Sequence, residues 1–199
     1  MTDTLPADLM ALLTELDAAD HDLEALTSDL ADSVATCRPA TGGWCVTECI
    51  DHLATANEAY VTAMRGPAQR ALEGGRHRRG PARPGVLGAF FVWMLEPPPR
   101  WWAYLPMPKT LAPAPAPPLA TTLPKFRTSQ DGIRSFIRSY AAVDLAGVTF
   151  PNPFIRGVRF SLATGLNVLT AHQRRHLLQA WKARRSAEGT QAALGGGAA

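Results

Sequence analysis

The sequence predicts an all-α fold, a bundle of four helices around one hydrophobic core. Apolar residues recur at spacings of three and four along four stretches of the chain, which is the period of an amphipathic helix. Prolines and glycines interrupt this pattern after the first stretch and before the last. With 199 residues, of which 46% are hydrophobic and 19% are charged, the chain is long enough for one sizeable core. We therefore expect a single domain over residues 1–187.

The first helix is expected over residues 6–36. Acidic residues lie between the members of its apolar stripe, which are Leu9, Leu12, Leu13, Leu16, Ala19, Leu23, Leu26 and Leu30. Pro39 and the adjacent Gly42 and Gly43 cannot continue a regular helix, so the segment that contains them is expected to be a loop.

A second helix is expected over residues 45–65. Its apolar stripe runs from Val46 to Met64, and His52 lies on the flank of that stripe. The polar Asn57 interrupts the stripe. Its side chain either donates a hydrogen bond to residues of a functional site or lies at a solvated edge of the helix. We favour the second interpretation.

The third helix is expected to begin at residues 128–131, because Thr128 and Asp131 resemble a capping box with Asp in place of Glu. Its apolar stripe continues to Tyr140, and the helix should end before Gly147.

Pro151 and Pro153 then predict a turn into the last helix, since proline cannot continue the helical hydrogen-bond ladder. The last helix is expected over residues 161–187, and its stripe includes His172 at one edge and His176. Residues 188–199 are rich in Gly and Ala and are expected to form a flexible tail.

A long insertion, residues 66–128, separates the second and third helices. It is too long for an ordinary loop and contains an arginine-rich part, an apolar part and a proline-rich part. The apolar part is too short to cross a membrane and predicts a short helix that covers one end of the bundle. Aromatic residues of the insertion either line a pocket or mediate self-association, or they form a lid packed on the core; these are Trp93, Trp101, Trp102 and Tyr104.

Charge and cysteine content limit the possible partners and compartments. The formal net charge is +3, but the chain carries no Lys or Arg before Arg38 and is strongly basic beyond it. We expect no nucleic-acid partner, because the acidic helix offsets this charge and no helix-turn-helix, zinc-finger or aromatic RNA-binding pattern accompanies it. No apolar run approaches the roughly 20 residues that span a bilayer, so no membrane partner is expected. Three cysteines without a framework spacing favour the cytoplasm.

The spacing of three histidines suggests a metal site. His172 and His176 are four residues apart and therefore share one helix face, while His52 lies on another helix. Three imidazoles from two helices can bind one divalent ion and leave a position open to water or substrate. A histidine on an apolar face is more often a core residue with a hydrogen-bond partner, so the spacing by itself is weak evidence.

A family resemblance strengthens the metal hypothesis. The string His172-x-x-Arg175-His176-x-x-Gln179, with Trp44 eight residues before His52, resembles the DinB/YfiT-like superfamily of four-helix bundles. The order of helices and the turn before the last helix fit the same family. The resemblance implies a divalent metal, often nickel, zinc or iron, held by His52, His172 and His176. It also implies a small-molecule substrate, a possible homodimer, and either hydrolysis or transfer of low-molecular-weight thiols.

The neighbouring residues leave several roles open. Cys45 stands where the family has a Ser or Thr helix cap, and a thiol is a poorer acceptor for the first amides of the helix. Cys49 lies one turn before His52 and is either a fourth, structural ligand or a small buried hydrophobe. Gln179 is a candidate partner of the ligands, and Arg175 a candidate for a structural ion pair. Gln173 stands where a H-E-x-x-H peptidase has its general base, which argues against a peptidase of this kind.

Two hypotheses follow from these residues. The first is a metal-dependent enzyme, a hydrolase or a low-molecular-weight-thiol transferase, that acts on a small substrate. The alternative is a non-catalytic helical-bundle binding protein with a structural or vestigial metal site, whose tryptophan-rich insertion is a partner surface.

Overall fold

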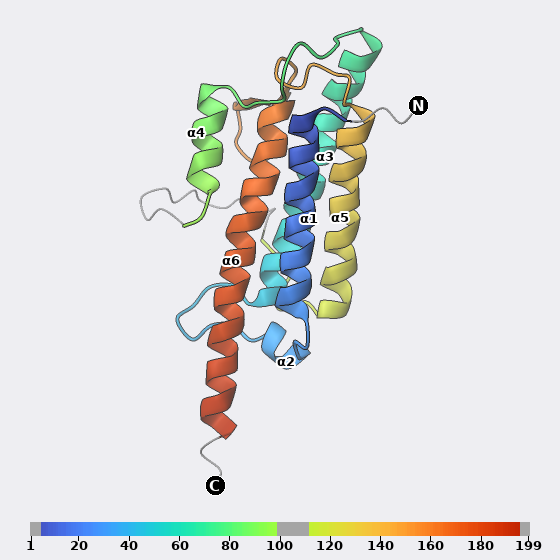
Figure 1. Ribbon diagram of the computed structural model, residues 1–199. Coiled ribbons are helices and arrows are strands. Elements are labelled where there is room, and N and C mark those ends of the chain that lie inside the picture. Colours follow the sequence, from blue (N-terminus) through green and yellow to red (C-terminus); the bar gives the residue numbers. More distant parts are fainter. Residues whose placement is uncertain (1–4, 99–111, 196–199) are drawn as a thin grey trace.

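The computed structural model describes residues 5–98 and 112–195, which form six helices and one two-stranded sheet (Figure 1). The prediction of an all-α protein is confirmed. In chain order the elements are α1 (Ala7–Thr27), α2 (Asp32–Ala35), α3 (Val46–Glu73), α4 (Val86–Leu95), α5 (Leu119–Ser139), β1 (Thr149–Pro151), β2 (Arg159–Ser161) and α6 (Leu162–Gly195). Four long helices, α1, α3, α5 and α6, lie side by side, and α3 packs against both α5 and α6.

The first helix is shorter than predicted. It ends at Thr27, and α2 follows as a separate short helix rather than as a continuation to residue 36. Ser28 leaves the helical region with a ψ of 128°, and Asp29 follows with a φ of 53° in the left-handed region, so the helical ladder stops here. Aspartate adopts this conformation more readily than most residues, so the break is local, although the apolar spacing continues through it to Leu30.

The second helix is longer than predicted and ends at Glu73 rather than near residue 65. Pro67 lies inside α3, where it removes one backbone hydrogen bond. The helix continues because Ala68 and Ala71 remain buried against the core and extend its apolar stripe beyond the proline. Burial of this face therefore outweighs the local penalty.

The third helix begins at Leu119, so the predicted start at Thr128 is wrong. The residues that resembled a capping box lie in the middle of α5. Thr122 and Phe126 are buried in its first two turns, although Pro124 lies between them. Helix α3 ends later than predicted and α5 begins earlier. The connection between them is therefore shorter at both ends than the predicted insertion, residues 66–128.

The turn before the last helix forms as predicted, within a small antiparallel hairpin in which Phe150 pairs with Phe160. Asn152 fixes the turn, because its side-chain oxygen accepts hydrogen bonds from the backbone amides of Phe154 and Ile155, at 2.8 and 2.9 Å. The last helix, α6, then continues to Gly195 rather than ending near residue 187. Alanine-rich sequence propagates a helix well, which accounts for this extension. Residues 196–199 of the expected tail lie outside the described residues.

The apolar part of the insertion forms α4, which lies alongside α6 rather than over the end of the bundle (Figure 1). Gly88 makes the close approach possible, since a Cβ atom there would collide with the side chain of Thr164 on α6. The rings of Phe91 and Phe160 pack with their centroids 4.9 Å apart. Trp101, Trp102 and Tyr104 lie outside the described residues. None of the described helices is long and apolar enough to span a membrane.

Candidate metal centre

The three predicted histidines lie together where α3 packs on α6. His52 on α3 is 2% exposed, and His172 and His176 on α6 are partly buried. One ring nitrogen from each histidine lies within 4.8 Å of the other two. The closest pair is Nε2 of His52 and Nε2 of His172, at 3.2 Å. The centroid of the His176 ring lies 4.6 Å from that of His52 and 4.5 Å from that of His172. Packing of α3 on α6 thus brings distant parts of the sequence to one point.

The electrostatics of the cluster keep two of the imidazoles neutral. Burial holds the pKa of His172 well below its ordinary value of 6.5, and the neighbouring His176, His52 and Arg175 lower it further. Burial also lowers the pKa of His176 to about 3, with the charges of His52 and Arg175 acting in the same direction. A contact from Gln179 opposes this shift. Neutral imidazole is the form that binds a metal ion.

This donor set fits a divalent metal ion. Two nitrogens bound at about 2.0–2.1 Å to one tetrahedral zinc ion lie roughly 3.3 Å apart, close to the 3.2 Å between Nε2 of His52 and Nε2 of His172. In addition, Nδ1 of His176 is buried and has no hydrogen-bond partner among the described residues. A buried polar nitrogen without a partner is costly unless it binds a proton donor or a cation.

Trp44 forms one wall of the site. Its ring packs against His52 with the centroids 4.7 Å apart and stacks on His176 with the centroids 5.7 Å apart. Trp44 directly precedes Cys45, the residue before the first turn of α3, so the start of this helix fixes the position of the indole. An aromatic wall limits the access of water to the histidines and fixes the orientation of their rings.

The start of α3 is stabilised by Glu48 rather than by a hydroxyl cap. The backbone amide of Cys45 donates to Oε2 of Glu48 at 3.0 Å, and Arg38 forms an ion pair with the same carboxylate. Burial of Glu48 acts to raise its pKa, but the hydrogen bonds from Arg38, Cys45 and Ala116 outweigh burial and hold the pKa below the ordinary value. The unusual Cys45 therefore does not displace the helix that carries His52.

Cys49 is a buried hydrophobic residue within the core rather than a member of the histidine cluster. Its side chain is fully buried among the apolar residues that surround Ile50 and Leu53. Burial also raises the pKa of the thiol far above its ordinary value. In the described part of the chain, the group that could hold a metal ion consists of the three histidines alone.

A layer of buried amide side chains crosses the bundle beside the histidines and separates its two apolar clusters. Nε2 of Gln173 donates to Oε1 of Gln130 at 2.8 Å and to Oδ1 of Asn57 at 3.4 Å. Asn57 in turn donates to Oγ of Ser129 at 3.0 Å, and Gln130 donates to Oδ1 of Asp20 at 3.0 Å. The layer thus links α1, α3, α5 and α6. The expectation that Asn57 lies at a solvated edge is wrong, because its side chain is fully buried.

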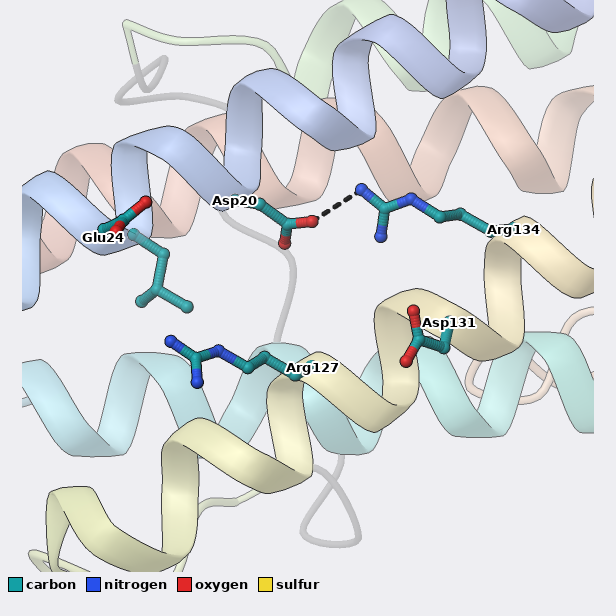
Figure 2. Close-up of a pocket in the computed structure, with 6 residues that line it drawn as sticks. Asp20, Glu24, Arg127, Asp131 and Arg134 are labelled. Atoms are coloured by element: carbon teal, nitrogen blue, oxygen red, sulfur yellow. Dashed lines mark hydrogen bonds and ion pairs between the residues drawn. The ribbon is translucent and has the colours of Figure 1, made fainter.

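This polar layer reaches the surface at a charged cleft between α1 and α5. The cleft has a volume of about 320 Å³ and lies away from the histidines. Figure 2 shows Asp20 and Arg134 pointing toward each other across it, and Arg134 also pairs with Asp17. Since its central charges are already paired, the cleft is a surface feature of the α1 and α5 contact.

Both described ends of the insertion are anchored next to the histidines. On α6, Arg174 forms an ion pair with Glu96, and Nη1 of Arg175 donates to the carbonyl of Met94 at 3.3 Å. On α3, Asp51 accepts a hydrogen bond from the amide of Ala114 at 3.1 Å. The anchoring residues are sequence neighbours of His176, His172 and His52, so the insertion leaves and rejoins the bundle beside the site.

Sequence reasoning missed several of these supporting residues. The apolar period does not single out Gln130, Asp51 or Glu48. Both acids are buried, and a carboxylate is rarely buried without a partner, so burial identifies them as supporting residues. The spacing of apolar residues in the sequence does not reveal this burial. Arg175 donates to a backbone carbonyl of α4 and also contributes positive charge beside the imidazoles.

The fold and the site define a class of helical proteins in which two helices supply three histidines that could hold a divalent metal ion. The sequence model of the DinB superfamily matches residues 15–180 of the chain. The chain therefore belongs to the DinB superfamily, as the histidine and tryptophan pattern predicted. No curated protein and no solved structure matches the chain significantly.

Proposed function

We propose that the protein is a metal-dependent enzyme, a four-helix bundle of the DinB/YfiT type, that acts on a small molecule. His52, His172 and His176 would hold one divalent ion, and the reaction would be hydrolysis or transfer of a low-molecular-weight thiol. The observation that carries the proposal is the convergence of three ring nitrogens within 4.8 Å of one another. When bound, the ion supplies a Lewis acid that lowers the pKa of a coordinated water or thiol and polarises the substrate.

The side chains of this protein would supply position and electrostatics. Trp44 covers one side of the His52 and His176 rings and limits the approach of water from that side. The partial exposure of His172 and His176 supports an open coordination position on the α6 side. Arg175 adds a positive charge that favours an anionic substrate group or thiolate beside the ion.

A structural metal site, one form of the non-catalytic alternative, requires a closed site with a fourth protein ligand. Cys49 was the candidate for that ligand, but its thiol lies in the apolar core and is not part of the histidine group. This observation favours an open site and hence the enzyme. Three free cysteines, two of them buried, also suit the reducing environment of the cytoplasm, where we place the protein.

Elemental analysis of the purified protein tests the metal assignment. We expect about one divalent ion per chain and, for His176→Ala, a loss of at least about 90% of it, since removal of one of three ligands weakens binding strongly. His21→Ala is the matched control, because His21 lies on the exposed face of α1 and its ring contacts the backbone of Asp17. Equal metal content in all three proteins would refute the assignment.

A cobalt-substituted sample then separates the two reactions. A transferase would bind a small thiol at the ion, and the visible spectrum of cobalt would change as sulfur enters its coordination sphere. A hydrolase would give no such change and would turn over model esters or amides without thiol. A metal-loaded protein that binds no thiol and hydrolyses none of these compounds would support the non-catalytic alternative.

A further inference from the structure

One face of α4 exposes large apolar side chains to solvent. Val86 is 88% exposed, Leu87 85%, Phe90 52% and Trp93 45%, and the rings of Phe90 and Trp93 stack with their centroids 5.7 Å apart. The opposite face of α4, with the buried Gly88, packs on α6. Single exposed apolar residues are ordinary, but a continuous row along one helix indicates an interaction surface.

The same end of the molecule is strongly basic. The segment that leads from α3 to α4 crosses the end of the bundle where α3 and α5 stop and α6 starts (Figure 1). Residues 76–95 contain no Asp or Glu. Arg78 pairs with Asp8, whereas exposed arginines of this segment and of the neighbouring elements are Arg70, Arg76, Arg79, Arg83, Arg138, Arg156 and Arg159. The exposed apolar row therefore begins next to a concentration of positive charge.

Three kinds of partner can be compared against this surface. A symmetric dimer through α4 would bring no acidic partner to Arg79 and Arg83, because residues 76–95 of the second copy contain no Asp or Glu either. One ten-residue helix also offers little of the roughly 800 Å² that each partner buries in a standard interface. A nucleic acid would satisfy the arginines, but phosphate recognition does not use Val86 and Leu87. An anionic lipid surface uses both kinds of side chain.

We propose that the exposed face of α4 and the arginine-rich segment before it dock on anionic lipid bilayers. Val86, Leu87 and Phe90 enter the boundary between headgroups and acyl chains, while Arg79 and Arg83 contact the headgroup phosphates. At 10 residues, α4 is too short to cross a bilayer and lies in the interface. No membrane partner was expected, because the sequence lacks an apolar run long enough to span a bilayer. A contact at the bilayer surface does not require such a run. The proposal is independent of the metal site.

Co-sedimentation of the full chain with vesicles tests the proposal. We expect binding to phosphatidylcholine vesicles that contain about one-third phosphatidylglycerol, little binding to pure phosphatidylcholine, and weaker binding at higher salt. Val86→Ser/Leu87→Ser should lower the partition coefficient by more than about tenfold, because two apolar side chains no longer enter the lipid. Arg79→Gln/Arg83→Gln should lower it about 25-fold, or about fivefold for each charge.

Matched variants separate these effects from general changes in charge or folding. Arg127→Gln/Arg185→Gln removes the same charge from exposed positions on α5 and α6, and should bind within about twofold of the original protein. Val86→Leu/Leu87→Val keeps the apolar character and should bind normally. All the substituted side chains are exposed, so circular dichroism and the melting temperature should stay unchanged.

Several results would overturn the proposal. The first is failure of the original protein to bind the anionic vesicles. The second is normal vesicle binding by Val86→Ser/Leu87→Ser. The third is tighter binding to duplex DNA that depends on Arg79 and Arg83 but not on Val86 and Leu87. The fourth is a dimer in sedimentation analysis that Val86→Ser/Leu87→Ser dissociates, which would assign the face to a second copy.

Discussion

Nε2 of His52 and Nε2 of His172 lie 3.2 Å apart, although 120 positions separate the two histidines in the sequence. Two ring nitrogens at this distance cannot both present a lone pair to each other without a proton or a cation between them. Either the Nε2–H of one neutral imidazole or a metal ion bound by both nitrogens can take this place, and burial keeps His172 in the neutral form that a metal ion binds. The contact between α3 and α6 thus creates the chemistry of this site.

Acid should destabilise the metal-free protein between pH 6.5 and pH 5. The pKa values of His172 and His176 in the folded chain lie below the ordinary 6.5, so the unfolded chain binds more protons in this range. Stability therefore falls as pH falls, by at most about 1.4 kcal/mol per pH unit for each histidine. The carboxylates with lowered pKa, Asp8 and Glu48, have ordinary values of 3.8 and 4.5 and act at lower pH.

Urea denaturation in the presence of a chelator measures this slope. The variant His172→Gln/His176→Gln should show a much smaller dependence on pH over the same range, since the two groups that titrate are gone. An equal slope in both proteins would contradict the low pKa values of the buried imidazoles.

The buried amide layer should be sensitive to loss of its central member. Gln173→Leu removes the donor to Gln130 and Asn57, whose buried oxygens then lack that partner, so the free energy of unfolding should fall by about 1–3 kcal/mol. Gln191→Leu at an exposed position of α6 is the control and should change stability by less than about 0.5 kcal/mol. A Gln173→Leu protein as stable as the original would show that the layer contributes nothing to the fold.

Glu48 should hold the returning end of the insertion on α3. Its carboxylate accepts hydrogen bonds from the amides of Cys45 and Ala116, at 3.0 and 3.2 Å. Glu48→Ala leaves these amides without their acceptor, and we expect a loss of about 1–3 kcal/mol of stability and faster proteolysis near Ala116. Glu58→Ala on the exposed face of the same helix should change neither. Unchanged proteolysis in Glu48→Ala would refute the anchoring role.

Two glycine-to-alanine changes should have opposite effects on stability. At Gly88 a methyl group would collide with Thr164 and push α4 away from α6, at a cost of about 1–3 kcal/mol. At Gly132, inside α5, a methyl group meets no atom within 4 Å, and Gly132→Ala should stabilise the helix by about 0.5–1 kcal/mol. Thermal denaturation of both variants checks the pair. A Gly88→Ala protein with unchanged stability would show that α4 does not depend on the close approach.

The sequence by itself determined the features that depend on local period and spacing. Apolar residues at intervals of three and four identified the long helices, and the i,i+4 spacing placed His172 and His176 on one face of the last helix. The proline pair before that helix identified the turn. These features are local because each rests on the geometry of one element and the conformational limits of its residues.

Only the tertiary structure decided where helices begin and end, which polar residues are buried and where the insertion lies. The early start at Leu119 depends on the burial of Thr122 and Phe126, which overrides the presence of Pro124. The burial of Asn57 depends on partners from α5 and α6, which no periodic pattern along α3 encodes. The cluster of three histidines likewise exists because α3 packs on α6 in one register, and that register is fixed by contacts far apart in the sequence.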